Sequence, residues 1–310
     1  MVNYPKSQHG YISLSYRYLR LAMVVLVLTL GASLAGEIIW GTGWLGSISA
    51  YYYTPVHSIF VGMLVAIGVS LIALKGRDSI EDMFFNIAGV LAPVVALVPT
   101  TVPNEGIEAD ETFIISTTGL VRNNVPAFLV GLVLAIAVGF AKPSTRELLN
   151  VKARDLVTAV TGSKAARLGG GALVLMLVGG VVWYFQWSDH FEKWAHGTSA
   201  IAMFFFIWCA VLVNIGAPRG LMEKLYRKLG EDPPPVPQPA LRRKYMWVAI
   251  GMAGTAIVIG VTQSIEWDQR VFWLEAIEIA LFARFWVLQT YDGWEHGTTC
   301  ELPHTHPDDR

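Results

Sequence analysis

The chain has 310 residues, of which 54% are hydrophobic and only 15% are charged, and its formal net charge is −1. Soluble proteins carry about 25% charged residues, so this chain has too little charge to cover an ordinary soluble fold. We therefore exclude a cytosolic enzyme, a disordered chain and a disulfide scaffold. The apolar residues gather in long runs separated by short polar segments, which indicates a polytopic membrane protein.

Eight apolar runs are long enough to cross the hydrocarbon core as helices, which takes about 20 residues each. In chain order they lie near residues 20–41, 57–74, 83–100, 125–141, 171–187, 194–215, 245–263 and 271–290. The runs are continuous, whereas the strands of a membrane β-barrel would alternate over segments of about ten residues. We therefore predict an all-α transmembrane helix bundle of about eight spans, forming a single domain over residues 1–290.

The first apolar run also has features of a signal peptide. Basic residues precede it, and the small residues Ser33 and Ala35 lie near its end, as at a cleavage site. The run continues through Glu37 to Trp40, as a retained helix would. We expect a retained first span, with cleavage as the alternative.

Lysine and arginine are distributed unevenly between alternate connecting segments. Nineteen of the 23 lie in the N-terminal segment, in the second, fourth and sixth connections and in the tail, whereas Arg122, Lys193 and Arg270 lie on the other side. The side rich in these residues is normally cytoplasmic. We predict that both termini lie in the cytoplasm and that the membrane is a bacterial plasma membrane.

The longest cytoplasmic connection, residues 216–244, joins a basic helix-like stretch to a segment with five prolines between Pro233 and Pro239. Such a segment is extended and stiff. Basic residues beside the inner leaflet attract anionic lipid, so we expect membrane lipids, including anionic lipid at these loops, as partners, and no nucleic acid. The tail, residues 291–310, is expected to be disordered. Cys209 lies in a span and Cys300 in the tail, so we expect no disulfide.

Ionisable residues at membrane depth are the strongest pointers to function, because burying a charge there is costly. Toward the outer face, the predicted spans bring Glu37, His57, His196, Glu275 and Glu278 to one level. The two glutamates of the last span point about 60° apart on a helix, so they share one stripe.

Three interpretations of this outer set remain open. The side chains pair with one another structurally; or His57, His196 and Glu275 hold a zinc ion for hydrolysis; or Glu275 and Glu278 carry protons or cations through the membrane. We predict no cofactor, because no HxxxH or HExxH motif places two metal ligands on one helix.

Arg284 lies in the inner half of the last span and needs a negative partner if it is buried. We predict a structural ion pair between Arg284 and Asp82, with Glu81 as the other possible partner. The alternative is that Arg284 extends to the inner headgroups.

The segment from Ser47 to Gly62, S-I-S-A-Y-Y-Y-T-P-V-H-S-I-F-V-G, resembles a motif of bacterial polytopic membrane proteins of unknown function. Further short stretches fit the same family. They are Glu81-Asp82 with Asn86-Ile-Ala-Gly-Val-Leu-Ala and Val95-Ala-Leu-Val-Pro-Thr100, then His196-Gly-Thr-Ser-Ala200, and Trp273-Leu-Glu275 with Phe285-Trp286.

That family is distantly similar to the DRAM-like proteins and to the CREST superfamily, which includes alkaline ceramidases. The CREST resemblance implies a zinc site of three His, one Asp and one Ser, for which this chain offers Ser49 or Ser58, His57, His196 and Asp82. It departs from that pattern in the last span, which has two glutamates instead of paired His. The candidate ligand-binding residues are Ser49, Tyr51, Tyr52, His57, His196, Glu275, Glu278 and Glu37.

We expect an integral membrane protein without catalytic activity that binds or handles lipid or a small ligand at its outer leaflet. The enzyme alternative is a metal-dependent membrane lipid hydrolase, and the transport alternative is a proton-coupled carrier.

Overall fold

The computed structural model describes residues 7–101, 117–140, 163–216, 221–232, 236–262 and 267–295, and these contain helices and connections but no β-strand. The α-helices are α1 (Ser7–Trp40), α2 (His57–Ala73), α3 (Ser79–Leu97), α4 (Thr117–Phe140), α7 (Lys164–Gln186), α8 (Ser188–Asn214), α9 (Leu221–Leu229), α10 (Pro239–Val261) and α11 (Arg270–Glu295). A short 3₁₀ helix, η1 (Ser49–Tyr53), precedes α2.

Each of the eight apolar runs coincides with one helix, in the predicted order: α1, α2, α3, α4, α7, α8, α10 and α11. Most helices extend beyond the apolar run, because a helix can continue into polar surroundings where hydropathy no longer marks it. α11 reaches Glu295, so residues 291–295 are helical and not part of a disordered tail. Cys300 and the rest of the tail lie outside the described residues.

The described helices have the composition of a membrane protein. α1, α3, α7 and α8 are long and apolar enough to cross a bilayer, while α2 and the Gly119–Leu134 part of α4 are apolar but shorter. Large apolar side chains also cover the outside of the bundle, as Trp247, Ile250 and Ile257 do on α10. Exposed apolar surface of this extent is typical of contact with lipid, and the chain is therefore a helical membrane bundle.

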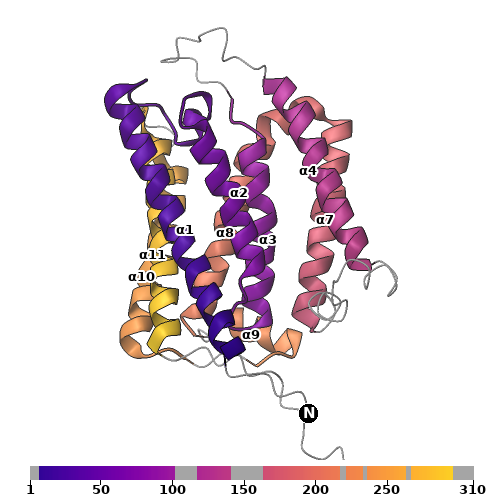
Figure 1. The fold of residues 1–310 in the computed structure, drawn as a ribbon, viewed down its shortest axis with the longest axis vertical. Coiled ribbons are helices and arrows are strands. Elements are labelled where there is room, and N and C mark those ends of the chain that lie inside the picture. The colour runs from indigo at the N-terminus through magenta and orange to yellow at the C-terminus, as the bar shows by residue number, and fades with distance from the viewer. Residues whose placement is uncertain are drawn as a thin grey trace, which may run out of the picture.

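The helices run alternately up and down between two ends of the bundle (Figure 1). α9 and the start of α1 lie at the end that we call the inner end, and η1 lies at the opposite, outer end. α2, α3 and α8 form the centre, α1, α10 and α11 lie on one side, and α4 and α7 lie on the other. Of the basic segments predicted to be cytoplasmic, the described α2–α3 connection with Lys75 and Arg77 and the helix α9 lie at this inner end.

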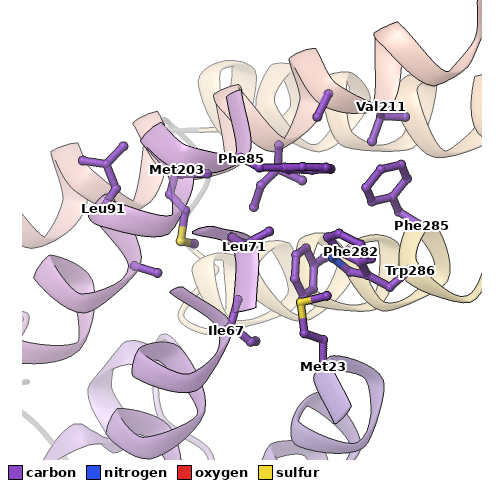
Figure 2. Close-up of a cluster of buried hydrophobic side chains, with 14 of the residues drawn as sticks. Met23, Ile67, Leu71, Phe85, Leu91, Met203, Val211, Phe282, Phe285 and Trp286 are labelled. Atoms are coloured by element: carbon purple, nitrogen blue, oxygen red, sulfur yellow. The ribbon is translucent and has the colours of Figure 1, made fainter. Parts of the chain in front are cut away.

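The centre of the bundle is closed by large apolar side chains from α1, α2, α3, α8 and α11 (Figure 2). Met23 of α1, Leu71 of α2 and Phe85 of α3 meet Phe285 and Trp286 of α11, and none of them is more than 1% exposed. Phe85 stacks on Trp286 with ring centroids 5.3 Å apart. This packed layer, which we call the central layer, separates the two ends of the bundle.

α2 and α3 approach each other at two glycines. A Cβ atom on Gly68 would lie 2.7 Å from the carbonyl oxygen of Gly89, and one on Gly89 would lie 2.7 Å from that of Gly68. Pro93 lies beside this contact, with its Cδ 2.8 Å from the same Gly68 position. Small residues allow helix backbones to pack this closely in membranes.

We predict that Gly68→Ala lowers the apparent melting temperature of the detergent-purified protein by roughly 3–10 °C, because a methyl group facing a backbone carbonyl forces the two helices apart. The control is Gly62→Ala on the same helix, where a Cβ would meet nothing within 4 Å. Equal shifts for the two variants would contradict the close α2–α3 contact.

Candidate functional site

Three polar side chains from distant parts of the chain meet near the outer end, and we call Ser49, His196 and Glu275 the outer cluster. Ser49 Oγ lies 2.8 Å from Glu275 Oε1 and 2.9 Å from His196 Nε2. The other oxygen of Glu275, Oε2, accepts hydrogen bonds from the backbone N–H groups of Ile48, at 2.5 Å, and Ser49, at 3.2 Å. Ser49 and His196 are buried.

The start of η1 is held against α11 by contacts outside the cluster itself. The backbone N–H of Phe272 donates to the carbonyl of Gly46, 2.9 Å away. Trp44 packs edge-on against Phe272 and beside Trp273, with ring centroids 5.1 and 5.6 Å apart. Glu275 is one helical turn after Phe272, so these contacts place its carboxyl group beside the N–H groups at the start of η1, which have no acceptor within that helix.

His196 is fixed by the end of α3. Its Nδ1 lies 2.7 Å from the carbonyl oxygen of Val98, which follows the last residue of that helix. A carbonyl can only accept a hydrogen bond, so Nδ1 carries a proton and Nε2 is the atom that faces Ser49. The outer cluster therefore joins η1, α3, α8 and α11.

An apolar cavity of about 60 Å³ opens directly beneath the outer cluster. Ser49 and Glu275 form its polar part, and its walls include the aromatic side chains Phe60, Phe204 and Phe282. A volume of this size has room for several water molecules or for a short alkyl group. The cavity is bounded at its inner side by residues such as Ile67, which also borders the central layer.

Tyr51, Tyr52 and His57 lie near the outer cluster but bind elsewhere. The Tyr51 hydroxyl donates to the carbonyl of Gly43 at 2.7 Å and accepts from the N–H of Leu45 at 3.1 Å, which supports the loop before η1. His57 Nδ1 lies 2.9 Å from the carbonyl of Tyr52, and their rings meet edge to face at 4.3 Å. Burial raises the pKa of Tyr51 and raises that of Tyr52 to about 12, so both phenols stay neutral.

Glu37 and Glu278 are also separate from the outer cluster. Glu37 accepts from the backbone N–H of Thr42 at 3.0 Å and closes the end of α1. Glu278 accepts from the hydroxyl of Thr255 on α10. Glu275 and Glu278, predicted to share one stripe of α11, therefore face different elements, because a difference of about 60° on the helix turns one toward η1 and the other toward α10.

The described residues contain no group of three or more His, Cys, Asp or Glu side chains placed to hold a metal ion. Of the set implied by the CREST resemblance, Ser49 and His196 meet, while His57 contacts Tyr52 instead. Asp82 lies near the start of α3, and Val98, which holds His196, lies just beyond its end. The two residues are separated by about 24 Å along the helix, so Asp82 does not reach the outer cluster.

A second buried polar group lies near the inner end, and we call Glu81, Asn214 and Gln289 the inner cluster. Glu81 has no exposed surface. Its Oε1 accepts from the side-chain amides of Asn214 and of Gln289, the latter at 2.8 Å, and its Oε2 accepts from the N–H of Arg77 at 2.5 Å. Gln289 also donates to Asn214 Oδ1 at 3.0 Å, so α3, α8 and α11 are tied together.

The inner cluster is connected to the inner surface through Asp78. One carboxylate oxygen of Asp78 accepts from the N–H groups of Ile80 and Glu81 and caps α3. The other accepts from the hydroxyl of Tyr226 on α9 at 2.5 Å. Burial, and then the hydrogen bond to Asp78, raise the pKa of Tyr226.

The predicted ion pair between Arg284 and Asp82 does not form. Asp82 pairs with Lys75, with Nζ 3.1 Å from Oδ2, and Arg77 pairs with Asp292. Arg284 is exposed on the side of α11 that faces away from the bundle, which agrees with the alternative that it extends to the inner headgroups. The prediction failed because depth in the membrane does not tell which side of the helix a residue faces.

Several residues of these sites were not identified from the sequence. Asn214, the backbone groups of Ile48 and Val98, and the cavity-lining phenylalanines carry no distinctive motif. Asn214 had a usable signal, because it is an amide at the inner end of a predicted span, where polar side chains need an internal partner.

Comparison with protein-family models, with characterised proteins and with solved structures finds no match for the chain.

We predict that Glu81→Leu lowers the apparent melting temperature by roughly 5 °C or more, because the buried amides of Asn214 and Gln289 lose their shared acceptor. Arg284→Leu, at an exposed position of α11, is expected to change it by less than about 2 °C. Thermal unfolding of both variants in the same detergent checks the prediction, and a larger loss for Arg284→Leu would contradict this assignment of the two charges.

Proposed function

We propose that the protein binds a small ligand or the end of a lipid in the cavity beneath the outer cluster, with the polar group of the ligand at Ser49 and Glu275. The observation that carries this proposal is the position of the cavity, whose walls are apolar and whose polar groups are confined to one end. A cavity of this kind suits an amphiphilic molecule, since apolar walls supply burial and a few placed polar groups fix its orientation.

The proposed site belongs to the outer leaflet of a bacterial plasma membrane. The Lys and Arg distribution supports both termini in the cytoplasm, and the outer cluster is at the opposite end from α9 and the start of α1. The central layer supports binding in preference to transport, because Phe85, Phe285 and Trp286 fill the space between the outer and inner clusters.

We predict that Ala200→Phe, which fills the cavity from α8, removes a small molecule that the wild-type protein retains through purification in a mild detergent. Ala200 lines this cavity, whereas Ala202 lines a separate apolar groove of about 500 Å³ between α3, α4, α7 and α8. Ala202→Phe is therefore the matched control.

Mass spectrometry of molecules extracted from the three purified proteins provides the measurement. One compound present with the wild type and with Ala202→Phe but absent from Ala200→Phe is the expected result. The same compounds in all three proteins, or none in the wild type, would count against a ligand in this cavity.

We also propose that α9 binds anionic lipid at the inner leaflet. α9 buries Met222 and Tyr226 and exposes Lys224, Arg227 and Lys228. The apolar face of α9 packs on the bundle, and its exposed basic residues are free to attract anionic headgroups beside the inner leaflet. The hydrogen bond from Tyr226 to Asp78 attaches this helix to the cap of α3, so lipid contact at α9 stabilises the bundle.

We predict that nanodiscs of phosphatidylglycerol raise the apparent melting temperature by several degrees relative to phosphatidylcholine, since each basic residue near an anionic surface contributes about 1 kcal/mol. Replacing Lys224, Arg227 and Lys228 together with Gln should remove most of this difference. Replacing the exposed outer-end residues Arg122 and Lys193 with Gln is the control, and an unchanged lipid effect in the α9 variant would refute the proposal.

A further inference from the structure

The hydroxyl of Ser49 lies between two groups that can each accept its single proton. Glu275 Oε1 is 2.8 Å away on one side and His196 Nε2 is 2.9 Å away on the other. Both short contacts are hydrogen bonds only if a second proton lies on Glu275 or on His196 Nε2, because Ser49 donates once. The outer cluster therefore holds one proton beyond those of Ser49 Oγ and His196 Nδ1.

This extra proton leaves the outer cluster with no net charge. Either Glu275 is protonated and His196 is neutral, or Glu275 is ionised and His196 is an imidazolium, and the proton passes between them through Ser49. Removal of the proton gives a net charge of −1 and leaves one of the two contacts without a hydrogen, which is unfavourable in a buried site. A positive charge in the adjacent cavity would compensate the ionised cluster.

The cavity has the features that recognise such a charge. Phe60, Phe204 and Phe282 line it, and Glu275 is the ionisable side chain among its lining residues. Aromatic faces together with a carboxylate bind ammonium groups that carry methyl or other alkyl substituents. Apolar walls favour the alkyl substituents, and the small volume of about 60 Å³ limits their size.

We infer that the ligand of this site is a small alkylammonium cation that binds between the phenylalanine rings and Glu275 in exchange for the proton of the outer cluster. This inference rests on the proposed function of the cavity. The balance is that a neutral, singly protonated cluster and a free cation give an ionised cluster with the cation bound, plus one released proton. No covalent bond other than that to the proton changes.

Other titratable groups of the outer end are occupied by different partners. On α11, Glu278 contacts Thr255; at the end of α1, Glu37 contacts Thr42; before α2, His57 contacts Tyr52. On η1, the hydroxyl of Tyr51 contacts Gly43 and Leu45. The cavity-lining residues of α2, α3 and α8 are apolar, so the exchanged proton belongs to the outer cluster.

The test is calorimetric titration of the full chain in nanodiscs with tetramethylammonium chloride, in two buffers that differ in ionisation enthalpy. We expect release of one proton per cation bound at pH values where the free cluster is protonated. In that range the affinity for tetramethylammonium should rise about tenfold per pH unit and should level off above it, because the proton and tetramethylammonium compete for the same cluster. Neopentyl alcohol, a neutral molecule of similar size, should bind more weakly and release no proton.

Glu275→Gln should weaken tetramethylammonium binding at least about thirtyfold and abolish proton release. Glu278→Gln, on the same helix but directed to α10, is the matched control and should bind like the wild type. Phe204→Leu keeps the cluster and removes one ring, so it should weaken binding roughly threefold to thirtyfold while one proton is still released. The Phe204→Leu variant keeps the test valid if Glu275→Gln does not fold.

Binding of tetramethylammonium without proton release, equal binding of neopentyl alcohol, or no binding of the cation by the wild type would each overturn the inference. Loss of a retained molecule in Ala200→Phe would still support the proposed function in any of these cases. The two claims therefore fail separately.

Discussion

A carboxyl group inside a membrane bundle must find all its hydrogen-bond partners within the protein, because lipid supplies none. Glu275 meets this requirement with two backbone N–H groups at the start of η1 and the hydroxyl of Ser49. Glu81 meets it with the N–H of Arg77 and the amides of Asn214 and Gln289. Neither depends on a lysine or arginine side chain, so both are held by directed hydrogen bonds from several helices.

The same contacts that satisfy Glu275 also form the polar end of the candidate site. The carboxyl group fixes η1 on α11, Ser49 carries the connection to His196, and His196 reaches the end of α3. The cavity begins where these polar contacts end and apolar side chains take over. Stability and the proposed ligand binding therefore depend on one set of atoms, while the central layer keeps the inner cluster apart.

The sequence was sufficient to predict the helices and part of the site. Apolar runs predict spans because lipid contact acts along each helix. His196 and Glu275 were among the candidates because polar groups at membrane depth are costly, and Ser49 was a candidate through the resemblance of the Ser47–Gly62 segment to a family motif. The sequence was insufficient to predict the partners of Glu278 and His57 and the exposed position of Arg284. Depth can be read from the sequence, but the neighbouring helix and the face that a residue presents depend on packing between distant segments, and the partners of Glu275 and His196 include backbone groups of Ile48 and Val98 that have no side-chain signal.

A double-mutant cycle between Ser49→Ala and Glu275→Gln tests the central claim, that these two side chains form one buried unit. The free energy of unfolding would be measured in mixed micelles for the wild type, both single variants and the double variant. The structure predicts that the double variant is more stable than the sum of the single losses allows, by about 0.5–3 kcal/mol. Losses that add within about 0.3 kcal/mol would show that the two residues act independently and would contradict the outer cluster.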